Sequence, residues 1–290
     1  MKPIRPKPQF SRRDFLKLLV RFALYGSASL AGGSLYATWL EPSWIEVAQV
    51  SLKLPRLPAA FSGFRLAQIS DIHFGSWMTP ERLQTAVDLL VAQAPDAVAI
   101  TGDFVYGSPA MAQAALEPAR EIFASLARRA QVFATMGNHD HWTDVGLVRH
   151  FLATTNIREL RNDIFPIKRD GQTLYLCGVD DVWEKHAELD VVRAKLPENA
   201  CAILLAHEPD FAPQAAATGC FDLQISGHSH GGQVVIPFWG PPLLPYLGQH
   251  YPAGLYRVKE MFQYTNRGLG MIRPTLRFNC RPEITLFTFT

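Results

Sequence analysis

Short apolar runs alternate with longer amphipathic stretches through the middle of the chain. The runs at residues 64–69, 95–101 and 132–136 have the length and composition of buried strands. The stretches at residues 79–93 and 110–129, which separate these runs, have the length and apolar spacing of helices. Strands that alternate with helices predict parallel pairing and an α/β fold.

The last third of the chain is richer in strands. Further apolar runs occur at residues 174–179, 202–206 and 223–226, and the strand-rich character continues to the C-terminus. This order predicts two packed mixed sheets with helices outside them. Residues 52–61, which contain two prolines, are expected to lead from the N-terminal segment into the first core strand.

Five short polar blocks each follow one of the apolar runs. Side chains two residues apart on a strand project to the same face, so Asp71 and His73 are expected to bind one ion together. Gly102 allows a sharp turn that places the Asp103 carboxylate where it can bridge two ions. Oxygen and imidazole ligands in this pattern predict a pair of divalent metals. The blocks are Asp71-Ile72-His73, Gly102-Asp103, Gly137-Asn138-His139-Asp140, His207 and Gly227-His228-Ser229-His230.

The order of these blocks resembles the signature of the calcineurin-like metallophosphoesterases, which is D-x-H, GD, GNH[D/E], a lone His and GHxH. The gaps agree as well, because about 28 residues separate His73 from Gly102 and about 31 separate Val105 from Gly137, enough for one crossover helix each. The resemblance runs from residue 61 to the C-terminus. It implies a four-layer α/β/β/α sandwich of two mixed sheets.

The resemblance also implies a role for each residue. His139 would be the catalytic acid, and two ions of Mn, Fe or Zn would provide metal-bound hydroxide as the nucleophile against a phosphoester. One metal would be held by Asp71, His73, Asp103 and His230, and the other by Asp103, Asn138, His207 and His228.

Several polar residues near the blocks fit two roles. Asp140 is expected to orient either His139 or a metal ligand. His141 is more simply explained as an exposed loop residue than as a residue that supports a ligand or faces the substrate. Asp180 and Asp181 fit either an outer hydrogen-bonding role towards the ligand histidines or a plain turn.

Residues 1–43 are expected to form an export signal. Residues 11–17 (SRRDFLK) match the twin-arginine motif S-R-R-x-F-L-K at every defined position, after a basic, proline-rich start. The twin-arginine translocation machinery is therefore a predicted partner, and the protein is expected on the periplasmic face of the cytoplasmic membrane. Cleavage near Ala31 and retention of residues 18–40 as a membrane anchor both remain open.

Residues 44–290 are expected to form one metallophosphoesterase domain, and the net charge of this part differs in sign from that of the N-terminal segment. The chain has 28 basic and 26 acidic residues, but residues 1–40 contain seven of the basic and one of the acidic ones. The rest carries 21 basic and 25 acidic residues, a net charge of −4. A polynucleotide partner is therefore not expected.

The substrate is less clearly indicated. The extension Gly231-Gly232-Gln233 resembles an exported bacterial subgroup associated with phosphodiester hydrolysis, with relatives that split UDP-2,3-diacylglucosamine. A phosphodiesterase acting on a lipid-linked or nucleotide-sugar phosphoester is predicted, with a phosphomonoesterase or a non-catalytic metal-binding scaffold as alternatives. The apolar loop at residues 237–247 either contacts acyl chains or a membrane surface, or folds over the core.

Overall fold

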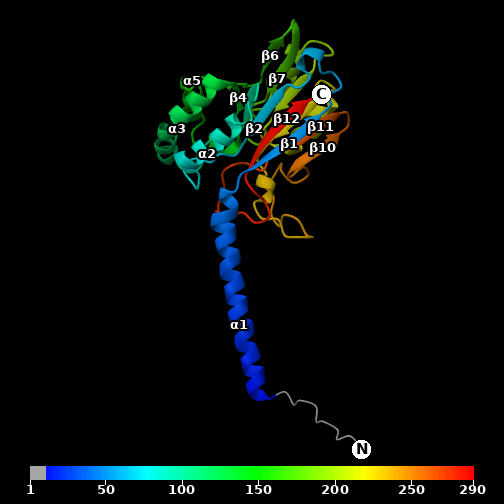
Figure 1. Cartoon of the computed structure of the whole chain (residues 1–290). Coiled ribbons are helices and arrows are strands. Elements are labelled where there is room, and N and C mark those ends of the chain that lie inside the picture. The colour runs from blue at the N-terminus through cyan, green and yellow to red at the C-terminus, as the bar shows by residue number, and fades with distance from the viewer. Residues whose placement is uncertain (1–10) are drawn as a thin grey trace, which may run out of the picture.

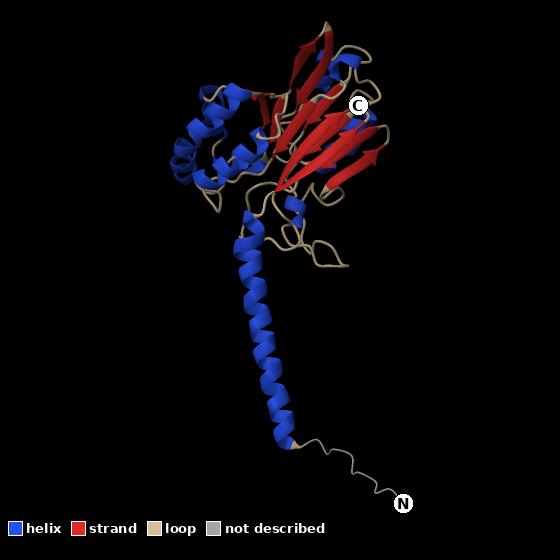
Figure 2. Ribbon diagram, in the orientation of Figure 1, coloured by secondary structure: helices blue, strands red, loops and turns tan. Residues whose placement is uncertain are grey.

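Two mixed sheets packed face to face form the body of the protein in the computed structural model, which describes residues 11–290 (Figure 2). The basic start of the predicted export signal, residues 2–8, lies outside the described residues. The first sheet has the strand order β1 (Glu46–Leu52), β12 (Glu283–Phe289), β2 (Arg65–Ile69), β3 (Ala97–Thr101), β4 (Gln131–Thr135) and β5 (Arg158–Glu159). The second has the order β10 (Gly254–Val258), β11 (Met261–Thr265), β9 (Leu223–Ser226), β8 (Ala202–Leu205), β7 (Gln172–Gly178) and β6 (Asp163–Arg169).

Parallel pairing dominates the part of each sheet that carries the polar blocks. Strands β2 to β5 are mutually parallel, as are β7, β8, β9 and β11. Antiparallel pairs join β12 to β2, β10 to β11 and β6 to β7. The carboxyl ends of β2, β3 and β4 therefore lie at one edge of the first sheet, and those of β8 and β9 at one edge of the second.

The alternation of side chains on β3 shows how the layers form. Ala97 and Ala99 belong to the apolar core between the sheets, whereas Val98 and Ile100 pack towards the helices. That outer face is covered by α2 (Pro80–Val91), α3 (Pro109–Arg129) and α5 (Val145–Thr154), as Figure 1 shows. Residues of α6 (Leu189–Lys195) and α7 (Ala212–Ala217) cover the second sheet. The predicted four-layer α/β/β/α sandwich is confirmed.

Strand β1 precedes residues 52–61, the segment that was expected to lead from the N-terminal segment into the first core strand. Strand β1 pairs in parallel with β12 at the edge of the first sheet, so residues 52–61 connect two strands rather than leading from the N-terminal segment. The sequence of β1, EVAQVSL, mixes polar and apolar residues because an edge strand is only partly covered. The C-terminal third also contains less strand than predicted, since residues 233–253 and 266–282 form mainly loops.

The N-terminal helix α1 (Arg12–Leu35) extends away from the body and buries none of its residues there (Figure 1). Ser11 caps it, and Asp14 completes a capping box with Ser11. A π-helical turn (Tyr36–Leu40) and a 3-10 turn (Glu41–Ser43) continue it to the body. By length and composition, the helical segment Arg12–Ser43 is able to cross a membrane.

Contacts between this segment and the body begin at its last turns. The carbonyl of Ala37 accepts a hydrogen bond from the N–H of Arg277 at 2.9 Å. The buried Glu41 carboxylate accepts hydrogen bonds from the backbone N–H groups of Asn279, at 2.9 Å, and Cys280. The helix is thus joined to the body through the loop that precedes β12.

Candidate metal centre

The seven predicted metal ligands meet at the carboxyl ends of the central strands. Those after β2, β3 and β4 come from the first sheet, and those after β8 and β9 come from the second. Buried against one another, they form a polar cluster where the two sheets face each other. The ligands are Asp71, His73, Asp103, Asn138, His207, His228 and His230, and all are buried.

The backbone of these ligands differs from the extended strand expected for Asp71 and His73. Both residues have positive φ, 50° and 53°, and Asp103 has a φ of 57°. His228 and His230 also adopt this left-handed conformation. It costs residues with a Cβ atom on the order of 1 kcal/mol each, so the folded body holds these ligands in a strained arrangement. The side chains converge because of these turns and not because of strand alternation.

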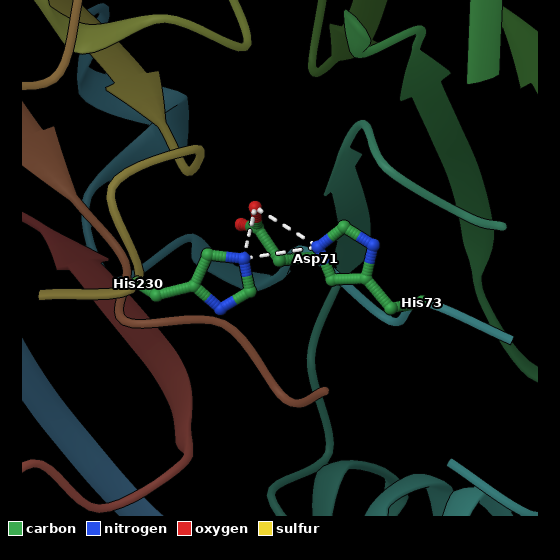
Figure 3. A group of neighbouring side chains, drawn as sticks. All are labelled: Asp71, His73 and His230. Carbon is green, nitrogen blue, oxygen red and sulfur yellow. Dashed lines mark hydrogen bonds and ion pairs between the residues drawn. The ribbon is translucent and has the colours of Figure 1, made fainter. Parts of the chain in front are cut away.

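The first group of ligand atoms joins both sheets (Figure 3). His73 Nε2 lies 2.9 Å from His230 Nε2 and 4.0 Å from Asp71 Oδ1. His230 Nε2 lies 3.4 Å from the same Asp71 oxygen. The other Asp71 contacts support its position, because both carboxylate oxygens accept the N–H of His228 at 3.0 Å. These three side chains can supply ligands to one cation.

The second group shares Asp103 with the first. Asp103 Oδ2 lies 3.5 Å from His73 Nε2 and 3.2 Å from His207 Nε2. His228 Nδ1 lies 3.3 Å from His207 Nε2. The Oδ1 atom of Asn138 is buried and has no hydrogen-bond partner in the described structure. A buried amide oxygen without a donor is costly, and a cation would compensate it.

The hydrogen bonds on the far side of two imidazoles favour metal binding. His207 Nδ1 lies 2.6 Å from the carbonyl of Thr101, and His228 Nε2 lies 2.7 Å from the carbonyl of Tyr246. A carbonyl can only accept, so these nitrogens carry the proton. In His228 the opposite nitrogen then has a free lone pair directed at the cluster. Burial alone would lower the pKa of His207, but Asp103 raises it well above its ordinary value, so a metal would displace a proton from His207 Nε2.

Burial favours the neutral form of three ligand imidazoles. It lowers the pKa of His73 and of His228 to about 3 and that of His230 well below its ordinary value, so these imidazoles are neutral. Burial also raises the pKa of Asp71 to about 7, so a cation there would compete with a proton near neutral pH. Burial alone would raise the pKa of Asp103, but His207 and His139 hold it well below its ordinary value. Neutral imidazoles beside a carboxylate are what divalent cations require. The residues therefore fit two divalent metal ions.

Gly102 allows the ligand loops to approach each other. A Cβ atom at Gly102 would lie 2.6 Å from His207 Nδ1 and 2.7 Å from the backbone nitrogen of Gly137. The backbone of Gly102 also has a φ of 89°. Any side chain here would separate the loops after β3 and β4.

His139 lies at the edge of the cluster and is half-buried. Its backbone N–H donates to Asp103 Oδ1 at 2.9 Å, and its ring lies 4.9 Å from the ring of His73. A ring nitrogen of His139 is also within 4.8 Å of ligand atoms of His73 and Asp103. The ring is therefore close enough to act on a substrate held by the metals, and close enough to bind one of them.

The other residues with two possible roles now have defined contacts. Asp140 accepts hydrogen bonds from backbone N–H groups of the Asp103 loop, so it orients Asp103, one of the predicted ligands. The expectation of an exposed loop position for His141 was wrong, because it lies in α4 (Asn138–Thr143) with its Nε2 2.9 Å from Asp180 Oδ1. Asp180 also binds Arg149 at 2.7 Å. Asp181 accepts the N–H of Glu184 at 2.6 Å, as in a turn.

An aromatic wall that the sequence did not predict lines one side of the centre. The ring of Trp142 lies 4.9 Å from that of His139 and 5.2 Å from that of Trp183. Trp183 continues the wall to Tyr246, at 5.4 Å. Trp142 comes three residues after His139, and this proximity was the one available signal. The wall offers flat apolar surface to whatever group is attached to a bound phosphate.

Arg277 is a second residue that the sequence did not indicate. It is fully buried, and its guanidinium donates to the carbonyls of Arg267, Gly268, Gly270 and Cys280 at 2.7–3.1 Å. The N–H of Gly270 in turn donates to the carbonyl of Asp71 at 2.7 Å. Arg277 therefore organises the loop that supports the first ligand.

Comparisons with known proteins agree with this geometry. Residues 64–232 match the family described as "Calcineurin-like phosphoesterase". The chain is 33% identical to the "Uncharacterized metallophosphoesterase YkuE" of Bacillus subtilis, over 97% of this chain and 98% of that protein. It is 30% identical to the "Phosphodiesterase YaeI" of Escherichia coli, over 95% and 98%. A Danio rerio "Transmembrane protein with metallophosphoesterase domain" is 32% identical, over 83% of this chain and 56% of that protein.

Proposed function

The chain belongs to the calcineurin-like phosphoesterase family and is a metallophosphoesterase, and we propose that it hydrolyses phosphodiesters at the outer face of the cytoplasmic membrane. The family uses divalent metals, and the described site contains clustered Asp and His side chains that suit them. The phosphodiester class is supported by the similarity to a protein named phosphodiesterase.

One observation carries the proposed reaction, and it is the position of Asp103 between the two ligand groups. Its Oδ2 atom is within 3.5 Å of His73 Nε2 and within 3.2 Å of His207 Nε2. A pair of divalent ions held there would activate water and neutralise the phosphoryl oxygens in an in-line displacement. In the proposed arrangement Asp71, His73, Asp103 and His230 hold one ion, and Asp103, Asn138, His207 and His228 hold the other.

His139 is the proposed general acid. When a phosphodiester is hydrolysed, one ester group departs as an alkoxide, which needs a proton as its bond to phosphorus breaks. His139 is half-buried at the edge of the cluster, so its ring can meet both the substrate and solvent. Its backbone N–H donates to Asp103, which holds the backbone of His139 beside the predicted ligands.

Two surfaces beside the centre could contact the two ester groups of a phosphodiester substrate. The aromatic wall of Trp142, Trp183 and Tyr246 forms one. An apolar groove of about 260 Å³ forms the other, and it runs from His228 and His230 to Leu243 and Ile272. A lipid-linked or nucleotide-sugar phosphoester such as UDP-2,3-diacylglucosamine would suit these surfaces, since it joins a flat polar group to acyl chains.

The location follows from α1 in this proposal. The helical segment Arg12–Ser43 can cross a membrane, and Arg12 and Arg13 at its start belong to the twin-arginine motif. A relative carries the word transmembrane in its name. We assign residues 18–40 as a retained anchor and residues 44–290 as the catalytic domain.

A comparison of two soluble substrates tests the reaction. The purified full chain, loaded with Mn²⁺, should hydrolyse bis-p-nitrophenyl phosphate faster than p-nitrophenyl phosphate. Faster turnover of the monoester would favour a phosphomonoesterase. Activity on neither substrate with two bound ions would favour a non-catalytic scaffold.

The variant Asp103→Asn tests the centre itself. It should lose more activity and more bound metal than His230→Ala, because only Asp103 would serve both ions. Metal content from plasma emission spectroscopy should fall below one ion per chain. Full activity with unchanged metal content in Asp103→Asn would refute the assignment.

A further inference from the structure

The loop at residues 236–247 exposes large apolar side chains beside the point where α1 joins the body. Phe238 and Trp239 at its tip are 111% and 86% exposed, and Leu243 is 81% exposed. Such a cluster is unusual on a protein surface that faces only water. We propose that this loop docks on the lipid bilayer and forms a second membrane contact next to the anchor.

A closed turn presents the tip. The N–H of Ile236 donates to the carbonyl of Gly240 at 2.9 Å, and the N–H of Gly240 donates back to Ile236 at 2.9 Å. Phe238 adopts a φ of 68° and Gly240 one of 93°, which bend the chain between these bonds. The two aromatic side chains are therefore held outward and the tip does not fold over the core, whereas Tyr246 at the other end of the loop contacts His228.

The base of the loop is connected to the end of α1 through one short segment. Phe278 lies between them, because its N–H donates to Gln233 and its carbonyl accepts from Val235, at 2.9 and 2.8 Å. On its other side, the ring of Phe278 meets the ring of Tyr36 edge-on at 6.4 Å. Helix and loop thus leave the body at the same end, where Figures 1 and 2 show the loop beside the upper part of α1.

The residues around this junction have the composition of a membrane interface. Trp39 and Trp44, at the end of the helical segment, are 68% and 57% exposed. The guanidinium of Arg281 lies 4.2 Å from the centre of the Trp44 ring. Tryptophan is enriched at headgroup depth. The Arg281 guanidinium also donates to the carbonyls of Trp44 and Ile45 and pairs with Glu46 at 3.7 Å, so it holds this junction together. A bilayer is therefore the occupant that matches both the apolar tip and the exposed tryptophans beside it.

Docking in this way would bring the metal centre close to the lipid surface. The apolar groove that begins at His228 and His230 is lined by Leu243 and Pro245 of the same loop, with Arg273 opposite. A lipid phosphoester could then enter from the bilayer with its acyl chain along the groove. This step rests on the proposed function, whereas the docking of the loop does not.

Depth measurements on the full chain test the docking. A nitroxide is attached through Trp239→Cys, with a matched control through Leu255→Cys, an exposed apolar position on β10. Both variants carry Cys220→Ser, because the other three native cysteines are buried. The chain is reconstituted in vesicles of phosphatidylethanolamine and phosphatidylglycerol. The label at position 239 should collide more with oxygen than with a water-soluble nickel chelate, and the label at position 255 the reverse.

Two results would overturn the proposal. One is a label at position 239 that is as accessible to the nickel chelate as the control label at position 255. The other is spin–spin broadening at position 239 that disappears when unlabelled chain is added, because the tip would then contact a second copy.

Activity separates the docking from the reaction. Phe238→Ser/Trp239→Ser should hydrolyse soluble bis-p-nitrophenyl phosphate like the wild type, but cleave hexadecyl p-nitrophenyl phosphate in the same vesicles roughly tenfold more slowly or worse, since each buried aromatic contributes more than 1.4 kcal/mol. Leu255→Ser should change neither rate. Equal rates for the loop variant and the wild type on the vesicle substrate would refute entry from the bilayer. A wild type inactive on both substrates would refute the proposed function, and the depth measurement would still decide the docking.

Discussion

The carboxylate of Asp140 holds the backbone of Asp103 in place, with its Oδ2 atom accepting the N–H of Asp103 at 3.0 Å. The same side chain accepts the N–H groups of Phe104, Val105 and Gly137 at 2.8, 3.2 and 3.0 Å. These donors come from the loops after β3 and β4, so one buried carboxylate joins the two loops that supply Asp103, Asn138 and His139. The left-handed turn at Asp103 is therefore stabilised by the hydrogen bonds that Asp140 accepts.

Asp140→Asn should loosen this junction. The amide has one acceptor oxygen where the carboxylate has two, and its NH₂ group would face backbone donors. We expect a loss of about 1–3 kcal/mol in the free energy of unfolding, together with lower metal content. Urea unfolding and metal analysis of the same sample measure both.

Asp144→Asn is the matched control for this substitution. Asp144 is exposed and caps α5 through the N–H of Leu147 at 3.0 Å, a role that asparagine fills equally well. It should leave the unfolding free energy and the metal content unchanged. If Asp140→Asn behaved like this control, the carboxylate would not organise the ligand loops.

The two mixed sheets and the polar blocks that the fold brings together could be predicted because both depend on local signals, whereas the four layers and the ligand roles came from the resemblance to a family. Apolar runs with polar residues at their carboxyl ends are visible without a structure, and β2, β3, β4, β8 and β9 all lie where such runs occur. The left-handed turns at Asp71 and His73 were not visible, because contacts with Gly102 and Asp103 impose them from another strand. The role of Arg277 was not predicted for the same reason, since a lone arginine in a loop gives no sign that four carbonyls surround it.

His139→Ala distinguishes an acid from a metal ligand. If His139 donates a proton, the variant should keep both ions while its rate falls about 10²–10⁴-fold. The loss should be smaller for nitrophenyl esters than for alkyl esters, because nitrophenolate scarcely needs a proton. The test measures the hydrolysis rates of both ester types and the metal content of the wild type and the variant.

His150→Ala, on the exposed face of α5, is the control and should change neither quantity. The loss of one ion from His139→Ala would show that the ring is a ligand, as its 4.8 Å reach to His73 and Asp103 allows. Equal losses for good and poor leaving groups would indicate that His139 positions the phosphate.

The pair of His141 and Asp180 should make stability depend on pH. Burial alone would lower the pKa of His141, but the hydrogen bond to Asp180 raises it above its ordinary 6.5. Burial likewise acts to raise the pKa of Asp180, yet His141 and Arg149 lower it from 3.8 to about 2. The contribution of His141 to stability is complete below pH 6.5 and is lost as pH rises through its pKa in the folded protein. The aspartate contribution is complete above pH 3.8 and is lost as pH falls towards 2.

His141→Gln should therefore lower the free energy of unfolding most between about pH 4 and pH 6 and less at pH 8. The two losses should differ by on the order of 1 kcal/mol. Urea unfolding of wild type and variant across this range gives the difference directly. His250→Gln is the control, because His250 is 77% exposed beside Asp210 and its pair is screened by water. A cost for His141→Gln that did not vary with pH would contradict the assigned charge on the histidine.

Export should depend on Arg12 and Arg13 together. These residues begin α1 directly after the Ser11 cap, and the twin-arginine route carries folded proteins, so the metals could bind before the chain meets Cu²⁺ and Zn²⁺ outside. Residues 1–45 fused to a reporter that is active only after export should therefore deliver it, and Arg12→Lys/Arg13→Lys should abolish delivery. Arg21→Lys, within the same helix but outside the motif, should not.

Fractionation of cells that express the full chain shows whether the helix is retained. Contacts with the body begin at Tyr36, so cleavage near Ala31 would leave them intact and release a folded, soluble protein several kDa below 32.4 kDa. Retention predicts a membrane pellet with the full mass instead. A reporter that still leaves the cytoplasm with both arginines replaced would show that the motif is coincidental and that residues 22–40, which carry no charge, use the ordinary secretory path.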